Sequence, residues 1–463
     1  MSLLKADNVG GLKIIIVGCG KVGATLVAQL INEGHDISVI DTDSARIQEI
    51  TNLYDVMGVI GNGASFTVQK DAGIDDADLL IAITGSDELN MLCCTVAKRV
   101  GDCAAIARVR TPDYSQEIGY LREKLGLALI INPELETAVE AANILSMPSA
   151  MEVDSFARGQ AQLIKFKIDD GSVLNGKAIM DLDHKHTESI LISAVQRDGE
   201  VAIPSGTFKL QAGDVISVLG TRKSVRKFMD YIGMRSHAVR TAMIVGGGRA
   251  AYYLALQLTN MGVEVKIIER DQKRCEELSI LLPKAIIIHA DGSDEEILRE
   301  EGIVNTDAFI PLTGIDEQNI MLTLYAKSVS KAKIVTKITR IGFSGVISGL
   351  DLDSVIYPNK ITAEAIIAYV RAMRNSQGYS NIETLYHLFD HKAEALEFKV
   401  GESNAATDIP LSELKLKKNL LVTCIIRGGR IIIPRGGDCI KKGDSIVVIT
   451  TDTGFKDITD ILA

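Results

Sequence analysis

The sequence predicts an α/β protein with two Rossmann-like domains, each a doubly wound parallel sheet and each followed by a small β-rich α+β domain. Two observations predict this fold. A glycine-rich loop between a strand-like and a helix-like segment occurs twice, and strand-like alternation of apolar residues follows each occurrence. The expected domains are 1–150 and 236–378 for the Rossmann-like folds and 151–235 and 379–463 for the β-rich folds.

Each glycine-rich loop joins an apolar, β-branched run to a segment with helical spacing of apolar residues. The loops read Gly18-Cys19-Gly20-Lys21-Val22-Gly23 and Gly246-Gly247-Gly248-Arg249-Ala250-Ala251. In this motif the first glycine permits a tight turn, the second lets a pyrophosphate approach the main chain, and the third allows close helix packing. The alternative is that the glycines only shape a Rossmann turn.

An acidic residue ends the strand that follows each loop, Asp41 in the first half and Glu269 in the second. Gly246 and Glu269 lie 228 residues after Gly18 and Asp41, so loop and acid were duplicated together. A carboxylate at this point can accept both ribose hydroxyls of an adenosine and would repel a 2′-phosphate. Arg270 weakens that exclusion in the second half.

The repeat continues beyond the loops, because 77–90 and 306–319 show the same succession of strand, polar turn and helix start. Thr84, Gly85, Thr313 and Gly314 are expected at carboxyl ends of strands, where ligands of such sheets bind. We expect Asp87 and Asp316 to be helix N-caps, with ligand contact as the alternative.

The β-rich domains are predicted from period-two alternation around 164–168 and 396–400 and from hairpin turns at 197–199 and 427–429. Helices are expected at 133–145 and 361–373. A further helix to about Tyr231 carries a basic face, which we expect to be solvated; an acidic partner or anionic lipid is the alternative. That face consists of Arg222, Lys223, Arg226 and Lys227.

Composition excludes several classes of function. The chain of 463 residues has a net charge of −10, which argues against nucleic acid as a partner. No apolar run approaches the roughly 20 residues of a membrane span, and a cytoplasmic location is expected. Seven scattered cysteines form no CxxC motif, so reduced thiols and no metal site are expected. The alternative role at Cys19 is a thiol with a lowered pKa.

The tandem organisation resembles the TrkA family, within the wider RCK or KTN group of potassium-conductance regulators. The resemblance rests on three stretches, 16–23, 39–43 and 106–110, and on the β-rich partner domains. It implies a cytoplasmic regulatory subunit, not an enzyme, at the cytoplasmic face of the inner membrane. Such a subunit is peripheral to the membrane and gates a membrane-embedded potassium transporter in response to NAD(H) or adenine nucleotides. It also implies a homo-oligomer, a tetramer by resemblance.

The same resemblance assigns Gly18, Gly20, Gly23 and Asp41 to the pyrophosphate and adenosine ribose, with Arg108 facing phosphate. Lys337 takes the place of Arg108 in the second half, and Asn62 replaces an acid that Asp291 retains. NAD or NADH is the expected cofactor, with ATP or ADP possible at one of the two sites. The complete set of expected binding residues is Gly18, Cys19, Gly20, Lys21, Val22, Gly23, Asp41, Asn62, Thr84, Gly85, Arg108, Gly246, Gly248, Arg249, Ala250, Glu269, Asp291 and Thr313.

An NAD-dependent oxidoreductase is the main alternative, because it would use the same loop. It needs a proton-transfer group beside the nicotinamide and a substrate domain, and the sequence shows no convincing candidate for either. An ATPase is disfavoured because no GxxxxGK[ST] loop is present. A scaffold with two inactive sites is the third possibility.

Overall fold

The computed structural model describes residues 11–115, 117–156, 159–234, 238–339, 347, 349–350, 352–374, 380–389, 391–401 and 403–463. The expected domain boundaries at 235/236 and 378/379 lie outside these residues. The chain forms two compact units. The first comprises Met1–Glu136 with Tyr357–Ala363, and the second comprises Thr137–Ile356 with Glu364–Ala463.

The first unit contains a six-stranded parallel sheet with the order β3-β2-β1-β4-β5-β6. β1 pairs in parallel with β2 on one side and with β4 on the other, so the order in which the chain adds strands reverses at β1. The strands are β1 Lys13–Val17, β2 Asp36–Asp41, β3 Met57–Ile60, β4 Leu79–Ala82, β5 Ala104–Arg108 and β6 Leu129–Ile131. The helices are α1 Lys21–Asn32, α2 Ser44–Leu53, α3 Phe66–Asp71, α4 Asp87–Val100, α5 Pro112–Ser115, α6 Ile118–Leu125 and α7 Pro133–Ser146, of which α7 continues into the second unit.

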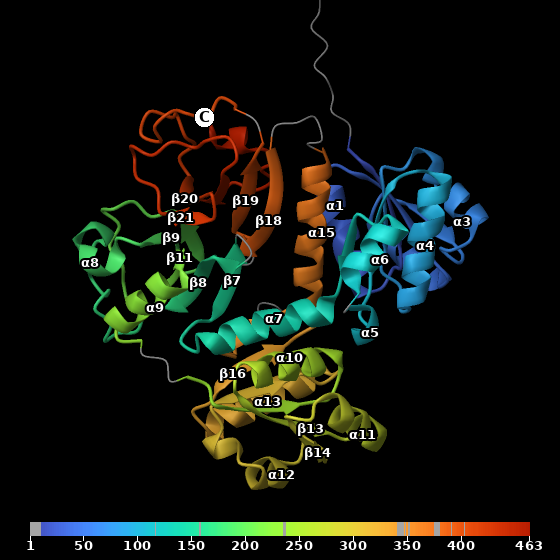
Figure 1. Cartoon of the computed structure of the whole chain (residues 1–463), viewed down its shortest axis with the longest axis horizontal. Helices are drawn as coiled ribbons and strands as arrows, with labels where there is room; N and C mark the ends of the chain where they lie inside the picture. The colour runs from blue at the N-terminus through green and yellow to red at the C-terminus, as the bar shows by residue number, and fades with distance from the viewer. Residues whose placement is uncertain are drawn as a thin grey trace, which may run out of the picture. The chain divides into compact units, whose positions relative to one another are not determined.

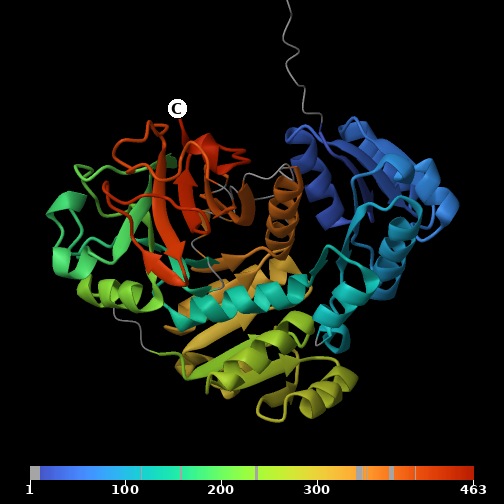
Figure 2. The ribbon, with the colours of Figure 1, turned by 45° about the horizontal axis from the view of Figure 1, so that its top comes forward.

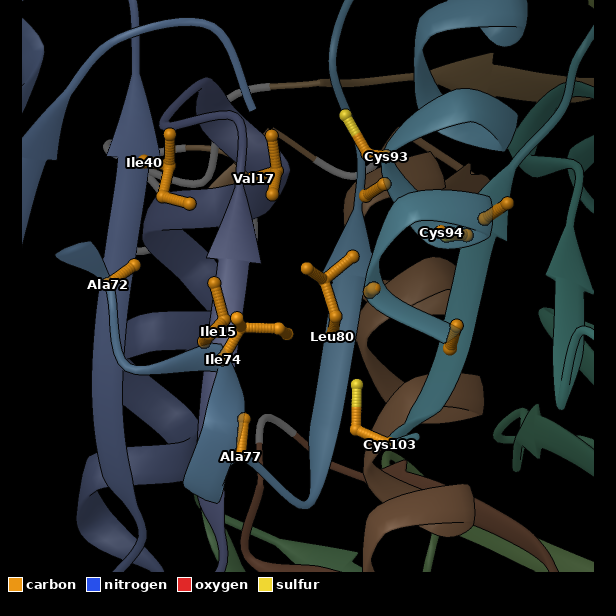
Figure 3. Packing of buried hydrophobic residues seen from close by; sticks show 14 of the residues in the cluster. Ile15, Val17, Ile40, Ala72, Ile74, Ala77, Leu80, Cys93, Cys94 and Cys103 are labelled. Atoms are coloured by element: carbon orange, nitrogen blue, oxygen red, sulfur yellow. The ribbon is translucent and has the colours of Figure 1, made fainter. Parts of the chain in front are cut away.

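Helices cover both faces of this sheet, with α1 and α4 on opposite sides (Figure 1). Central strands buried on both faces need continuous apolar runs, which β1 and β4 supply. On one face Ile15 and Leu80 pack with Cys93 and Cys94 of α4 (Figure 3). The core therefore fixes where β1 and β4 end, and the cavity described below lies at those ends.

The second unit contains the other Rossmann-like sheet, again six parallel strands, in the equivalent order β14-β13-β12-β15-β16-β17. Its strands are β12 Thr241–Val245, β13 Glu264–Glu269, β14 Ile286–His289, β15 Ala308–Pro311, β16 Lys333–Lys337 and β17 Ser354–Ile356. Its helices are α10 Arg249–Asn260, α11 Gln272–Leu281, α12 Glu295–Glu300, α13 Asp316–Val329 and α15 Pro358–Arg374, whose first residues belong to the first unit.

Two five-stranded antiparallel sheets complete the second unit, with orders β10-β9-β11-β8-β7 and β18-β19-β22-β20-β21. Each contains the predicted hairpin: Arg197 pairs with Glu200, and Arg427 with Arg430. The first sheet has β7 Glu152–Phe156, β8 Ala161–Lys167, β9 Ile190–Arg197, β10 Glu200–Ala202 and β11 Val215–Thr221, with helices α8 His184–Thr187 and α9 Arg222–Tyr231. The second has β18 Ser380–Leu388, β19 Ala393–Val400, β20 Leu420–Arg427, β21 Arg430–Ile432 and β22 Ser445–Thr450. Both sheets follow their Rossmann-like sheet in the chain, as the sequence predicts.

The two β-rich sheets share one hydrophobic core, so that they lie side by side in both views (Figures 1 and 2). Phe156 of β7 meets Tyr386 of β18 edge to face, with ring centroids 5.2 Å apart. The Tyr386 hydroxyl donates to the Ser155 carbonyl oxygen at 3.0 Å. These sheets form one body within the second unit.

A buried charge cluster joins α15 to β18 and β19. Glu364 and Arg371 come from α15, and His387 and Glu394 from the strands. Arg371 donates to both carboxylate oxygens of Glu394, at 3.1 and 3.2 Å. Glu364 Oε1 accepts from the His387 backbone N–H at 2.9 Å and lies 3.2 Å from its Nδ1. All four side chains are at most 8% exposed, so their pairing compensates for lost hydration.

This cluster predicts a pH dependence of stability. Burial favours the neutral ring, but hydrogen bonds to Glu364 and Glu394 raise the pKa of His387 above its ordinary value. The protonated ring therefore stabilises the fold fully below about pH 6.5, the unfolded value, and this contribution is lost as pH rises through the folded pKa. We expect the urea-unfolding midpoint of the wild type to fall over that window more than that of His387→Gln. Equal falls would show that His387 does not contribute.

Candidate functional site

A cavity of about 660 Å³ lies at the carboxyl ends of the strands β1, β2, β4 and β5 in the first unit. This is the point where the strand order reverses, which is the usual ligand position in doubly wound sheets. We call it the first-half cavity. Its lining consists of Val17, Gly18, Gly20, Lys21, Val22, Gly23, Ile40, Asp41, Thr42, Arg46, Gly61, Asn62, Gly63, Ile83, Thr84, Gly85, Ser86, Leu89, Arg108 and Asn359.

Glycine is favoured at each of the three positions of the first loop for a different physical reason. Gly18 has a φ of +107°, and a Cβ there would lie 3.0 Å from the Ile83 carbonyl group. A Cβ on Gly23 would lie 2.1 Å from the Gly18 carbonyl oxygen, so glycine lets α1 approach the loop. Gly20 has no atom within 4 Å of a Cβ position, so its space opens into the cavity. This is the space that a phosphate would take.

Asp41 ties the end of β2 to the glycine-rich loop. Its Oδ2 accepts from the Cys19 backbone N–H at 2.7 Å, and its Oδ1 accepts from the Asp43 N–H at 2.9 Å. A carboxylate offers about four lone-pair positions, so two such bonds leave capacity for ribose hydroxyls. Asp41 thus holds the loop and keeps further hydrogen-bonding capacity on its carboxylate.

A second polar network holds the opposite side of the cavity. The Asn90 Oδ1 accepts from both the backbone N–H and the hydroxyl of Thr84, each at 2.7 Å. The Asn90 amide donates to the Arg108 carbonyl oxygen at 2.9 Å, and the Arg108 guanidinium donates to the Thr84 carbonyl oxygen. Asn90, fully buried, therefore fixes the ends of β4 and β5 relative to each other. Thr84, Gly85 and Arg108 all line the cavity, as Asn62 does from the loop after β3.

Cys19 is the one residue of the first loop that does not line the cavity. It is buried, and burial, followed by the charge of Asp41, raises the pKa of its thiol to about 12. The alternative of a thiol with a lowered pKa is therefore wrong. The backbone N–H of Cys19 supports the site through its hydrogen bond to Asp41.

The expectation that Asp87 and Asp316 are N-caps is also wrong. Ser86 caps α4, and its hydroxyl accepts from the Leu89 N–H. Asp87 is instead the first residue of α4 and accepts from the Arg110 and Thr111 N–H groups. Burial opposes the ionisation of Asp87. The hydrogen bond from the Thr111 hydroxyl, followed by those from the two backbone N–H groups, nevertheless holds the pKa of Asp87 below its ordinary value. Asp316 likewise opens α13 and accepts from the Thr339 N–H.

The second half repeats this geometry in its own unit. Glu269 Oε2 accepts from the Gly247 N–H at 2.6 Å and Oε1 from the Asp271 N–H at 2.8 Å. Gly246 again has a positive φ, +98°, and Gly248 again has open space at its Cβ position. Asn319 repeats Asn90, because it binds the Thr313 N–H and hydroxyl and the Lys337 carbonyl oxygen. Arg249 and Ala250 open α10.

Asn62 and Asp291, where the two halves differ in charge, have the same structural role. The Asn62 side-chain oxygen accepts from the Ala64 N–H at 3.0 Å. Asp291 Oδ1 accepts from the Ser293 hydroxyl at 2.7 Å and from its N–H at 2.9 Å, which lower the pKa of Asp291. Each closes the turn after the third strand, so the substitution at Asn62 preserves the local fold.

Sequence reasoning missed four polar residues of the first-half cavity: Thr42, Arg46, Ser86 and Asn359. The Arg46 guanidinium lies 3.8 Å from Asp41 and 3.3 Å from Asp43. A signal for it existed, because Arg274 lies 228 residues later and donates to the Gly247 carbonyl oxygen at 2.7 Å. Asn359 gives no such signal, since it comes from a distant part of the chain.

The charges of the cavity suit a diphosphate ligand. Lys21, Arg46 and Arg108 line it as cations, against Asp41 as the carboxylate. Guanidinium and ammonium groups bind phosphate oxygens through strong, charge-assisted hydrogen bonds. Among the lining residues that the structure describes there is no histidine, tyrosine or cysteine. The charged residues of the described lining are therefore three cations and one carboxylate.

Family comparison matches most of the chain. The TrkA-N domain family matches residues 14–133 and 242–358, and the TrkA-C domain family matches residues 163–233 and 395–463. The chain belongs to the TrkA family, with its two kinds of domain in tandem repeat.

Similar curated proteins agree with this family. The Trk system potassium uptake protein TrkA of Haemophilus influenzae is 32% identical over 95% of this chain and 96% of its own length. TrkA homolog 1 of Methanosarcina mazei is 30% identical over 96% of this chain and 99% of its own. These names refer to potassium uptake and not to a reaction. The TrkA family to which this chain belongs thus includes proteins named for potassium uptake.

Solved structures support the fold. The GsuK channel bound to NAD aligns with a TM-score of 0.62 and 18% identity over 96% of this chain and 77% of the other. The GsuK RCK domain aligns with a TM-score of 0.62 and 18% identity, over 96% of this chain and 93% of the other. At this identity the likeness concerns the fold. In the described part of this chain, no helix has the length and apolar character that crossing a bilayer requires.

Two glycine variants distinguish an effect on nucleotide affinity from an effect on the stability of the fold. Gly20→Ala adds a methyl group where the structure leaves open space, so we expect stability within about 1 kcal/mol of wild type. NADH affinity should fall at least about tenfold, because the methyl group takes phosphate space. Calorimetric titration measures the affinity and urea unfolding measures the stability.

Gly23→Ala is the matched control, and it should destabilise the first unit by roughly 1–3 kcal/mol because its Cβ would meet the Gly18 carbonyl oxygen. Unchanged NADH affinity in a folded Gly20→Ala protein would contradict the placement of phosphate at this loop.

Proposed function

We propose that this chain is the nucleotide-binding regulatory subunit of a Trk-type system and gates a membrane potassium transporter in response to NAD(H) or adenine nucleotides. The observation that carries this proposal is the first-half cavity, which brings the glycine-rich loop, Asp41 and Arg108 to one place. The TrkA family membership supports the potassium transporter as the partner.

In the proposed complex the pyrophosphate lies at the loop from Gly18 to Gly23, and the adenosine ribose binds Asp41. Lys21 and Arg108 provide cationic charge for the phosphates. NAD, NADH, ADP and ATP share the adenosine and diphosphate that these groups would contact. Structures described as GsuK bound to NAD and GsuK bound to ADP support both kinds of ligand for this fold. The second half carries the equivalent residues and is the proposed second site.

The proposed mechanism is regulation without turnover. A nucleotide shifts a gate only through its different affinities for the closed and open states, and moving a gate from 1:99 to 99:1 takes about 5.5 kcal/mol. Two sites per chain in a homo-oligomer, a tetramer in this proposal, could share that free energy at about 1–3 kcal/mol each. The assembly would lie on the cytoplasmic face of the inner membrane. We also propose four domains, with boundaries near residues 150, 235 and 378.

Isosteric substitution of the acids tests the binding assignment. Asp41→Asn removes the charge that favours ribose hydroxyls and repels a 2′-phosphate. We expect it to weaken NADH binding roughly 10- to 100-fold and to reduce the preference for NADH over NADPH. If both sites bind, the titration of the wild type should show two binding phases, and Glu269→Gln should weaken the affinity in only one of them. Calorimetric titration of the full chain with NADH, NADPH, ADP and ATP measures each affinity.

The binding assignment is wrong if both variants bind all four nucleotides like the wild type. Potassium flux through the partner transporter in vesicles then tests regulation. Adding nucleotide should change the flux, and the Asp41→Asn variant should need a higher nucleotide concentration for the same change. Steady oxidation of NADH with a small keto substrate would instead favour the oxidoreductase.

A further inference from the structure

Asn359 gives the first-half cavity a contribution from the second half of the sequence. It is the second residue of α15, is 9% exposed and lines the cavity within the first compact unit. The other described lining residues all lie between Val17 and Arg108. A ligand in this cavity therefore meets a residue that the first half does not encode.

The helix that carries Asn359 continues into the second unit. From Glu364 onward α15 belongs to that unit, and the buried charge cluster of Glu364, Arg371, His387 and Glu394 fixes it to β18 and β19. Between Pro358 and Arg374 the sequence contains no glycine and no further proline, the usual causes of a kink. The first turn and the anchored turns are thus parts of one uninterrupted helix.

The anchored strands lead on to the paired β-rich sheets. Tyr386 precedes His387 on β18 and binds the Ser155 carbonyl oxygen of β7, and its ring packs on Phe156. A change in the position of α15 relative to β18 would disturb a buried ion network and this aromatic contact together. Such packed networks respond by moving as units, because their interiors are close-packed.

We propose that Asn359 contacts the bound nucleotide and that α15 transmits the occupancy of the first-half cavity to β18, β19 and the paired β-rich sheets. This inference rests on the proposed function. An asparagine amide has two donor hydrogens and an acceptor oxygen, a combination that can pair with a phosphate oxygen or a ribose hydroxyl. A nucleotide that binds more tightly in one position of α15 would shift the helix toward that position.

The test compares two amide deletions in the full chain, Asn359→Ser and the control Asn62→Ser. Both residues line the same cavity, but Asn62 belongs to the first half. Calorimetry gives the affinity for NADH and ADP, and hydrogen exchange at saturating nucleotide gives the protection of residues 380–388 and 393–400. We expect nucleotide to slow exchange there in the wild type and in Asn62→Ser.

In Asn359→Ser we expect affinity to fall about 3- to 10-fold and the slowing of exchange to disappear even at saturation. Asn359→Ala serves as the second variant if the serine protein does not fold. Wild-type affinity in these variants, or wild-type slowing of exchange, overturns the inference while leaving the proposed function intact. If the wild type itself takes up neither NADH nor ADP, both the proposed function and this inference fail.

Discussion

One hydrogen bond, repeated in each half, holds the glycine-rich loop in place: the carboxylate at the end of the second strand accepts from the second backbone N–H of the loop. Asp41 binds the Cys19 N–H at 2.7 Å, and Glu269 binds the Gly247 N–H at 2.6 Å. Because each bond joins two strand ends, it fixes the loop against the sheet before any ligand arrives.

The two halves share this frame but differ in the groups placed around it. In the first half Arg46 lies beside Asp41 and lines the cavity. In the second, Arg274 at the equivalent repeat position donates to the loop itself, at the Gly247 carbonyl oxygen. Lys337, in the place of Arg108, donates to the Leu312 carbonyl oxygen. The two halves thus have the same backbone arrangement, but the contacts of their cationic side chains differ. This difference would give the two sites different preferences among similar nucleotides.

The parts of the structure that could be predicted from the sequence are those that short-range sequence patterns determine. The two loops, their acids and the hairpins at Asp198 and Gly428 follow from spacing and turn chemistry, and the structure has them. Asp87 could not be assigned from sequence because its partners, the N–H groups of Arg110 and Thr111, lie more than 20 residues away. Asn359 could not be predicted at all, since only tertiary structure brings it to the cavity. The burial of the Cys19 side chain could not be predicted, because a loop position does not reveal which way a side chain points.

An experimental structure of the full chain with NADH at saturating concentration would show directly where the nucleotide binds. We expect a dinucleotide in the first-half cavity, with its pyrophosphate at Gly18 to Gly23 and the adenosine ribose hydroxyls on Asp41. A cavity that stays empty at saturation, or a dinucleotide bound away from Asp41, would contradict this expectation.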